Sequence, residues 1–195
     1  LDPDLSIDRS LKGAVKGKVV MITGGSSGIG EAAAIRIAEA GGKVIVVARD
    51  EEKLAEVRKK ITDAGGFVKT YSCDITEYAA NDKLAKDVLK EFGHVDVLIN
   101  NAGRSIRRSL ALSYDRFHDF ERTMQLNYFA CVRLTMNLLP SMTARKDGHV
   151  INVSSIGVLT NAPRFSAYVA SKAALESFAR CAASEFHDEN VHFTI

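Results

Sequence analysis

Short apolar runs alternate along the chain with longer stretches in which apolar residues recur at helical spacing. The short runs predict strands, because they are rich in β-branched residues and several are apolar nearly throughout, as strands buried on both faces are. No internal repeat or low-complexity tract interrupts the alternation. We expect strands at residues 18–23, 43–48, 67–72, 95–100, 149–154 and 191–195.

The longer stretches predict helices, and three of them begin beside a residue that can cap a helix. Asp50, Thr76 and Ser113 occupy these positions, where a side-chain oxygen accepts from free backbone N–H groups. Alternating strands and helices predict an α/β fold, a Rossmann-type doubly wound parallel sheet with right-handed crossovers. The expected helices cover residues 28–41, 51–64, 76–92, 113–143 and 166–187.

The size and composition indicate one domain. The chain has 195 residues, 46% hydrophobic and 26% charged, which is an ordinary globular balance. At this length roughly 70% of the unfolded chain's surface can be buried, so the core needs no metal or disulfide. We expect the domain at 18–195, preceded by a polar linker, residues 1–17, from an upstream segment. Because the sequence ends at its sixth predicted strand, we expect part of the substrate pocket to lie beyond Ile195.

Charge and cysteine usage exclude several classes of protein. The net charge of +2 argues against nucleic-acid binding, which usually shows a strong basic excess. Cys73, Cys131 and Cys181 are scattered and form no CxxC pair, which favours a reducing compartment, and we expect a cytoplasmic location. We expect no transmembrane segment, because no apolar run approaches the roughly 20 residues that a spanning helix needs. The sequence also begins with no pattern typical of a secretory leader.

A glycine-rich turn, TGGSSGIG at residues 23–30, joins the first predicted strand to an Ala-rich helix. In this position glycines let the backbone approach a pyrophosphate at the helix N-terminus, although a tight turn without a ligand is the plainer alternative. The spacing TGxxxGxG resembles that of the short-chain dehydrogenase/reductase superfamily. The candidate cofactor contacts in this turn are Gly24, Ser26, Ser27, Gly28, Ile29 and Gly30.

The same turn also satisfies the GxSxG nucleophile elbow of α/β-hydrolases, with Ser26 as the nucleophile. A hydrolase would need an acid and then a histidine at later strand ends. His118, His149 and His187 lie downstream, but none stands in a context that marks it as a catalytic base.

The end of the second predicted strand bears on the choice of cofactor. An NAD site places a carboxylate at the strand tip for the ribose hydroxyls, whereas an NADP site places a cation there for the 2′-phosphate. By alignment with the family the tip is Ala48, followed by Arg49. Asp50 lies 20 residues after Gly30 and competes for the role of ribose acid, but its capping role is favoured. We therefore expect NADP(H) rather than NAD(H).

Two further loops match motifs of the same superfamily. Asp74-Ile75 follows the third predicted strand, and the resemblance implies that this pair contacts adenine, although Asp74 alone is also typical of an ordinary turn. After the fourth strand comes the sequence NNAG, which in the family stabilises the sheet and lines the floor of the cofactor site. The resemblance assigns cofactor contacts to Asn101, Ala102 and Gly103.

Tyr168 and Lys172 are four residues apart, which places a phenol and an ammonium one turn apart on one helix face. A nearby ammonium favours the phenolate, so such a phenol exchanges a proton with a carbonyl or hydroxyl more readily. An isolated pair of this kind is more often an exposed helix surface. Ser155, at the end of a predicted strand, lies 13 residues before Tyr168, with Ser154 as the adjacent alternative.

Asn127 interrupts a long apolar-striped helix, where asparagine has poor helix propensity. The motifs TGxxxGxG, NNAG, Asn, Ser and YxxxK occur in the family's order, and the chain from 18 to 195 is identified as a member of the short-chain dehydrogenase/reductase superfamily. The resemblance implies four catalytic residues, of which Lys172 and Tyr168 also contact the cofactor and Asn127 holds a proton-conducting water through its backbone. These residues are Asn127, Ser155, Tyr168 and Lys172.

Segments 101–109, 115–128 and 156–168 resemble bacterial fatty acyl-CoA reductases. The implied substrate is a small-molecule carbonyl compound, a long-chain acyl-CoA or fatty aldehyde. Arg104, Arg107 and Arg108 follow the NNAG loop and offer cations for coenzyme A phosphates, while a solvated basic loop is the alternative. Two competing functions are a reductase that acts on another ketone, aldehyde or 3-oxoacyl substrate, and a non-catalytic NADP-binding module. A homodimer or homotetramer is expected by resemblance.

Overall fold

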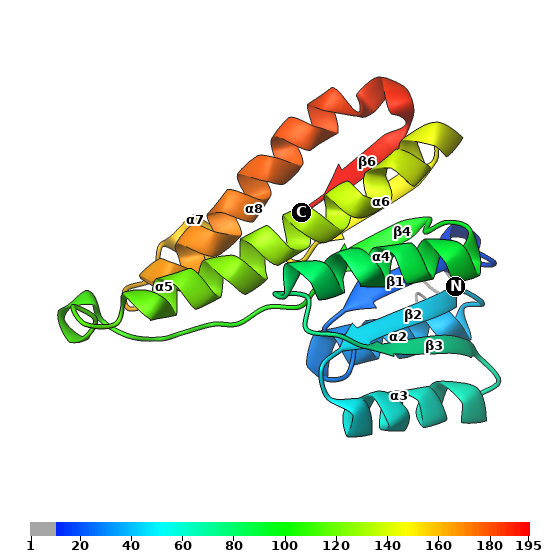
Figure 1. Cartoon of the computed structure of the whole chain (residues 1–195), viewed down its shortest axis with the longest axis horizontal. Helices are drawn as coiled ribbons and strands as arrows, with labels where there is room; N and C mark the ends of the chain where they lie inside the picture. Colours follow the sequence, from blue (N-terminus) through cyan, green and yellow to red (C-terminus); the bar gives the residue numbers. More distant parts are fainter. Residues whose placement is uncertain (1–10) are drawn as a thin grey trace, which may run out of the picture.

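Six parallel strands form one sheet in the computed structural model, which describes residues 11–195. The strand order β3-β2-β1-β4-β5-β6 is that of a doubly wound sheet, and every neighbouring pair is parallel (Figure 1). The predicted α/β fold class is confirmed. The strands are β1 Val19–Thr23, β2 Lys43–Ala48, β3 Phe67–Ser72, β4 Val97–Asn100, β5 Gly148–Asn152 and β6 Val191–Thr194.

Two predicted strand ends differ from the observed ones by two residues, and the flanking residues there make other contacts. β4 begins at Val97 rather than at residue 95, because the preceding Asp96 carboxylate accepts a hydrogen bond from the Val19 backbone N–H at 2.7 Å. β5 ends at Asn152 rather than at residue 154, and the Val153 carbonyl accepts a hydrogen bond from Lys172 Nζ at 2.7 Å. The chain thus leaves the sheet where it meets a side chain of the predicted site.

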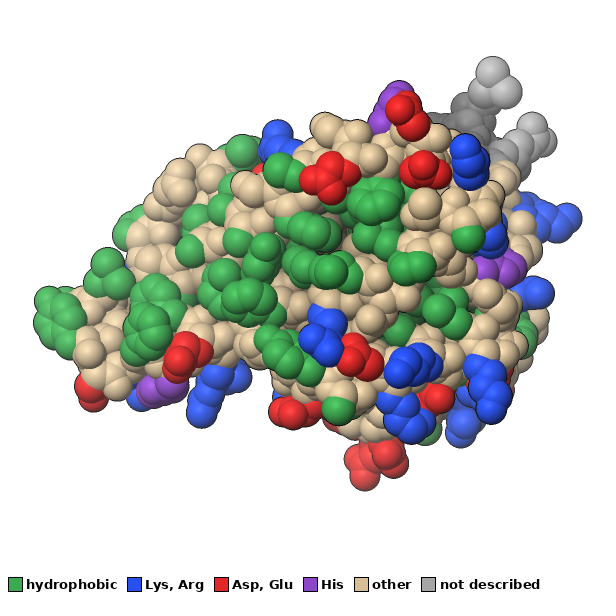
Figure 2. All heavy atoms as spheres, turned by 45° about the horizontal axis from the view of Figure 1, so that its top comes forward, with side chains coloured by type: hydrophobic (Ala, Val, Ile, Leu, Met, Phe, Trp, Pro, Cys, Tyr) green, Lys and Arg blue, Asp and Glu red, His purple; other side chains and the backbone are tan. Residues whose placement is uncertain are grey.

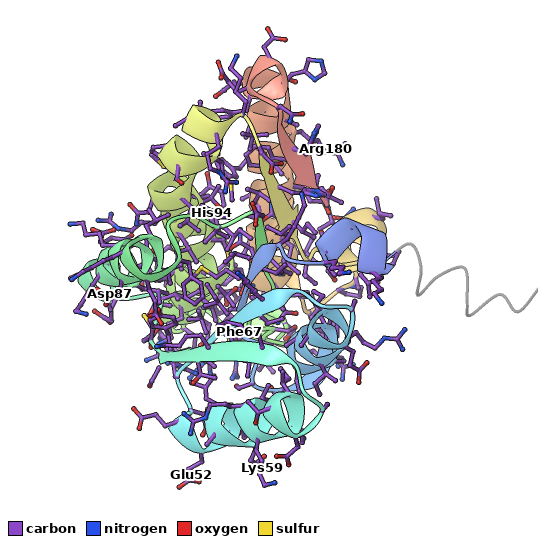
Figure 3. The ribbon with its side chains drawn as sticks, turned by 90° about the vertical axis from the view of Figure 1, so that its right-hand side faces the viewer. Glu52, Lys59, Phe67, Asp87, His94 and Arg180 are labelled. Atoms are coloured by element: carbon purple, nitrogen blue, oxygen red, sulfur yellow. The ribbon has the colours of Figure 1, made fainter. Side chains whose placement is uncertain are left out.

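Helices cover both faces of the sheet. Alternate residues of β1 and β2 pack against α2 and α3 on one face, and the intervening residues pack against α4 and α6 on the other. In Figure 3, α4, with Asp87, lies to the left of the sheet, and α3, with Glu52 and Lys59, lies beneath the edge strand that carries Phe67. The long helices are α2 Gly28–Glu39, α3 Glu51–Asp63, α4 Tyr78–Phe92, α5 Phe117–Met124, α6 Cys131–Arg145 and α8 Ser166–Glu185.

The long helix predicted at 113–143 differs from the observed one. The observed helix begins as α5 at Phe117, passes through a π-helical turn at Gln125–Ala130, and continues as α6 to Arg145. Short helical turns that the sequence did not predict lie at Leu110–Leu112, Gly157–Thr160 (α7) and His187–Glu189.

Of the three predicted helix caps, one is confirmed and two are wrong. The Asp50 carboxylate accepts from the Lys53 N–H at 3.1 Å at the start of α3. Thr76 does not cap α4, because its backbone N–H and hydroxyl both donate to Asp74 and Glu77 occupies the capping position. Ser113 does not cap α5, because its hydroxyl donates to the Ser109 carbonyl and closes the preceding turn.

Most of the predicted linker, residues 1–17, falls outside the described residues, and its role as a linker stays a prediction. Residues 11–15 are helical, and Val15 is buried in the core with α2 and α3. Among residues 11–195 no helix is both long and apolar enough to cross a membrane.

Candidate active site

The glycine-rich turn between β1 and α2 can be built only with glycine at two positions. A Cβ on Gly30 would lie 2.4 Å from Asn101 Nδ2 and 2.5 Å from the Gly24 carbonyl oxygen. Gly24 has φ +65°, and a Cβ there would lie 2.8 Å from Ala102 Cα. At the start of α2, Ser27 makes no side-chain capping bond, so the first N–H groups of the helix are left for another acceptor.

The NNAG loop after β4 is bonded directly to this turn. Asn101 Nδ2 donates to the carbonyls of Thr23 and Gly24 at 3.0 and 3.1 Å. The Thr23 hydroxyl accepts in return from the N–H groups of Asn101 and Ala102. Asn100 Nδ2 donates to Asn152 Oδ1 at 2.9 Å and so links β4 to β5. The two loops therefore form one rigid edge at the carboxyl ends of the strands.

A cleft of about 480 Å³ lies along this edge, within the size range of small-molecule sites. It runs from the glycine turn past the tips of β2 and β3 to the NNAG loop. Gly28 and Gly30 shape the turn without lining the cleft, and neither Tyr168 nor Lys172 belongs to its lining. The predicted cofactor contacts that it brings together are Gly24, Ser26, Ser27, Ile29, Arg49, Asp74, Ile75, Asn101, Ala102 and Gly103.

The tip of β2 places a cation at the mouth of the cleft. The Arg49 side chain is 75% exposed, and its guanidinium lies 3.4 Å from the Asp74 carboxylate. Burial alone would raise the pKa of Asp74, but hydrogen bonds from Thr76 and the charge of Arg49 outweigh it and hold that pKa below its usual value. Asp50 is engaged as the cap of α3, as predicted, rather than as a free carboxylate at the strand tip.

Lys172 lies at the inner end of the site. Its side chain is only 3% exposed, Nζ donates to the Val153 carbonyl at 2.7 Å, and burial lowers the pKa of the ammonium. A Cβ built on Gly103 would lie 3.4 Å from both Lys172 Nζ and Asn127 Oδ1. Lys172, Asn127 and the end of the NNAG loop therefore meet at one point.

Asn127 is fully buried in the π-helical turn, and all of its side-chain bonds connect elements of the site. Its Oδ1 accepts from the Arg104 N–H at 2.8 Å, and its Nδ2 donates to the Arg104 carbonyl and to the Ser171 hydroxyl, both at 2.9 Å. A π-helical turn carries one extra residue per turn and is frequent at functional sites. Here it brings the amide between the NNAG loop and α8.

Tyr168 and Ser155 lie on adjacent segments. Tyr168 is half-buried one turn before Lys172 on α8, and Ser155 follows β5, where its Oγ accepts from the Gly157 N–H at 3.1 Å. A Cβ on Gly157 would lie 3.2 Å from both Ser155 Oγ and Val169 Cγ2, which places Ser155 beside the residue that follows Tyr168. The catalytic assignments of the two residues stay predictions.

The sequence analysis missed three residues that support this end of the site. The Ser154 hydroxyl donates to Glu176 Oε1, and Arg180 pairs with the same carboxylate at 3.3 Å. Ser171 donates to the Tyr168 carbonyl at 2.7 Å while accepting from Asn127. Glu176 follows Lys172 by one helical turn, and this spacing is the only signal in the sequence that points to it.

The hydrolase alternative has no support in the geometry around Ser26. Within residues 11–195 no histidine lines the cleft that contains Ser26. His118 lies 3.3 Å from Asp119 instead, and His149 bonds to the Thr194 hydroxyl. The same described part of the chain contains no cluster of side chains suited to holding a metal ion.

Comparison with known proteins agrees with this geometry. A family model described as short chain dehydrogenase matches residues 18–195. A fatty acyl-CoA reductase of Acinetobacter baylyi is 58% identical over 180 residues, which are 92% of this chain and 61% of that protein. A fatty acyl-CoA reductase of Mycobacterium tuberculosis is 47% identical and matches 100% of this chain and 67% of its own length. The chain thus spans about three fifths of the Acinetobacter relative.

Solved structures show the same fold. A metagenomic short-chain oxidoreductase in complex with NADP superposes with a TM-score of 0.87 at 34% identity, over 92% of this chain and 81% of that one. An NAD+-bound xylitol dehydrogenase gives a TM-score of 0.85 at 27% identity, over 90% of this chain and 67% of its own. Since the family model covers the whole sheet and the site, the chain belongs to the short-chain dehydrogenase/reductase family of oxidoreductases.

Proposed function

We propose that the chain is the catalytic part of an NADPH-dependent reductase that transfers hydride to the carbonyl carbon of a long-chain fatty acyl-CoA or fatty aldehyde. The observation that carries the proposal is the continuous edge from the glycine turn through the NNAG loop to Lys172, where Gly103 abuts the ammonium. The fatty acyl-CoA reductases among its relatives support the substrate class.

The residues present fit a dinucleotide. The two close-packed glycines leave no room for a side chain where a pyrophosphate approaches, and the start of α2 offers uncapped N–H groups. The Asp74-Ile75 pair would contact adenine, and the NNAG loop would carry the nicotinamide half. Bound in its reduced form, the cofactor supplies the hydride. Arg49 favours NADP over NAD, because its exposed guanidinium suits the 2′-phosphate.

The chain's own residues then act on the carbonyl oxygen. Ser155 and Tyr168 hold this oxygen as negative charge develops on it, and the Tyr168 hydroxyl gives it a proton. Lys172, buried one turn away, favours loss of that proton and contacts the cofactor ribose. Asn127 fixes the NNAG loop against α8, and its backbone holds the water that returns a proton to the site. With a thioester, hydride addition gives a hemithioacetal, which expels the thiol of coenzyme A and leaves the aldehyde.

Apolar side chains next to Ser155 suit a fatty chain. Ile156, just before α7, and Leu159, on α7, are 71% and 75% exposed and place two large aliphatic side chains in solvent within one helical turn. Figure 2 shows further hydrophobic side chains gathered toward the end of the molecule that carries the 110–117 segment. A long acyl chain that contacts these residues removes their apolar surface from water.

The test is a stoichiometric assay of the purified protein with NADPH and palmitoyl-CoA. We expect one fatty aldehyde and one free coenzyme A thiol for each NADPH oxidised during the first reduction. Oxidation with ketones but with no acyl-CoA of any chain length would favour an oxidoreductase for another carbonyl substrate. NADPH binding without oxidation by any carbonyl compound would favour the non-catalytic binding module.

Two further expectations belong to the same proposal. We propose a homo-oligomer that buries the apolar hollow of about 650 Å³ between α6 and α8, whose lining includes Leu139, Pro140, Phe178 and Phe186. Light scattering coupled to gel filtration tests this directly, because a monomer over the working concentration range would contradict it. A cytoplasmic location also stays a prediction.

A further inference from the structure

A second hollow, of about 750 Å³, adjoins the nucleotide cleft at Gly103, the end of the NNAG loop. The two share Arg49, Thr76, Gly103 and Leu126, so they open into each other. The proposed catalytic residues and cofactor contacts leave the rest of this hollow without a role. Its remaining lining residues are Arg104, Glu121, Arg122 and Gln125.

The lining is strongly basic, with three arginines against one glutamate. Within residues 11–195 neither Arg104 nor Arg122 pairs with a carboxylate. Arginines nearby in the same part of the chain behave differently: Arg108 and Arg116 both lie against Asp119, at 3.4 and 2.9 Å. A hollow that is lined by more cations than carboxylates, two of these cations pairing with no carboxylate among residues 11–195, favours an anionic ligand.

The position of Arg104 is fixed by its backbone rather than by its side chain. Its N–H and carbonyl both bond to the buried Asn127 side chain, so the residue starts from the rigid core of the site while its guanidinium faces solvent. Arg122 projects from α5, the helix that leads into the same π-helical turn. The two guanidinium groups are therefore presented from elements that Asn127 ties together.

We propose that Arg104 and Arg122 bind the phosphate groups on the nucleotide half of coenzyme A when it carries the acyl thioester. This inference rests on the proposed function. Guanidinium groups suit phosphates because they donate two parallel hydrogen bonds, and the hollow has the size of a nucleotide site. Gly103 lines the hollow and lies against Lys172, so the hollow adjoins the proposed carbonyl site at this glycine.

The structure narrows the set of arginines that the sequence offered for this task. Arg108 is engaged, because its side chain lies against Asp119 and its backbone N–H donates to the Arg164 carbonyl at 2.7 Å. Arg107 is exposed but does not line the hollow. Arg122 lines the hollow, whereas Arg107 and Arg108 do not, and the sequence alone assigned no role to Arg122.

The experiment compares the double variant Arg104→Ala/Arg122→Ala with the wild-type protein. KM is measured for palmitoyl-CoA, for the free aldehyde of the same chain length, and for NADPH. Each lost charge-assisted bond weakens phosphate binding by about tenfold or more, so we expect the KM for palmitoyl-CoA to rise at least tenfold. The aldehyde carries no phosphate, and its KM is expected to change by less than about twofold. Arg58→Ala, an exposed arginine on α3, is the matched control for loss of charge.

Two results would overturn the inference. An equal rise in KM for aldehyde and thioester would show a general defect of the site, and a rise confined to NADPH would assign these arginines to the cofactor phosphate. If the protein reduces no acyl-CoA, the proposed function fails, and calorimetric titration of coenzyme A into the NADP+-bound protein decides the inference alone. Binding that weakens at least about tenfold in the double variant supports the phosphate site, while no binding to the wild type refutes it.

Discussion

Two regions meet at the edge of the sheet and are built in different ways. The glycine turn and the NNAG loop form the proposed nucleotide region, and Ser155, Tyr168 and Lys172 mark the proposed carbonyl region. The nucleotide region consists of backbone held at closest approach: a single methyl group on Gly30 would collide with both Asn101 and Gly24. The carbonyl region consists of side chains on the segment after β5 and on α8, flanked by apolar residues as exposed as Ile156 and Leu159. Added atoms should therefore damage the first region, and removed atoms the second.

The largest effect is expected from Tyr168→Phe. Loss of a positioned proton donor costs about 10²- to 10⁴-fold in turnover. NADPH affinity, measured by fluorescence titration, should stay close to that of the wild type, because the glycine turn is untouched. Tyr114→Phe, at a tyrosine that is 88% exposed, is the control for loss of a phenol hydroxyl. Turnover within a few-fold of the wild type would show that Tyr168 is not the proton donor.

The second effect is expected from Gly30→Ala, which adds one methyl group to the nucleotide region. Overpacking of this kind costs about 1–3 kcal/mol, and relief of the clash would move Asn101 or the Gly24 carbonyl. We expect weaker NADPH binding and a lower midpoint of urea unfolding. Gly13→Ala is the matched control, because a Cβ at Gly13 meets nothing within 4 Å. Wild-type NADPH affinity in Gly30→Ala would mean that the turn does not approach the cofactor.

A smaller effect is expected from Glu176→Gln, which sharpens the account of the carbonyl region. The Glu176 carboxylate accepts from the Ser154 hydroxyl and so ties the segment that carries Ser155 to α8. Loss of the charge should lower kcat by about tenfold, which corresponds to the loss of a hydrogen bond to a charged group. The KM for NADPH should change little. Glu185→Gln, exposed near the end of the same helix, is the control. Parallel loss of thermal stability and cofactor binding would indicate a purely structural role.

The smallest effect is expected from Asp82→Asn, on α4, a residue that lines neither the cleft nor the second hollow. Hydrogen bonds from Arg133 and Asn137 lower the pKa of Asp82 to about 2 from 3.8, so the carboxylate stabilises the folded state above its unfolded pKa. This contribution is lost as the pH falls through 3.8 toward about 2. Urea unfolding should show a small deficit for the variant at neutral pH that disappears in acid. A deficit that is independent of pH would contradict the assigned cause.

The contrast between the regions also explains what the sequence could predict. The central strands β1, β2 and β4 are buried and mostly apolar, and the predicted bounds of all six strands lie within two residues of the observed ones at each end. The glycine turn and the NNAG loop were recognisable because their close packing admits few residue types. The structure places these two segments side by side in the lining of one cleft.

Features that depend on which of several possible partners a polar group bonds to were not predictable. Thr76 looks like a cap, but Asp74, two residues earlier, takes both of its donors. Asn127 looked like an interruption of a helix, and nothing local indicates a π-helical turn whose amide bonds to Arg104 and Ser171. The Ser154–Glu176 contact and the basic hollow at Arg122 likewise join segments that only the fold brings together.

We expect hydride to pass directly from a cofactor bound in the nucleotide region to a carbonyl carbon held in the carbonyl region. The decisive measurement supplies NADPH deuterated in turn at each of the two C4 positions of the nicotinamide, with an acyl-CoA substrate, and analyses the aldehyde by mass spectrometry. We expect that deuterium from one C4 position, and not from the other, appears at the aldehyde carbon. Aldehyde that contains no deuterium from either cofactor, or deuterium lost to the solvent, would contradict it.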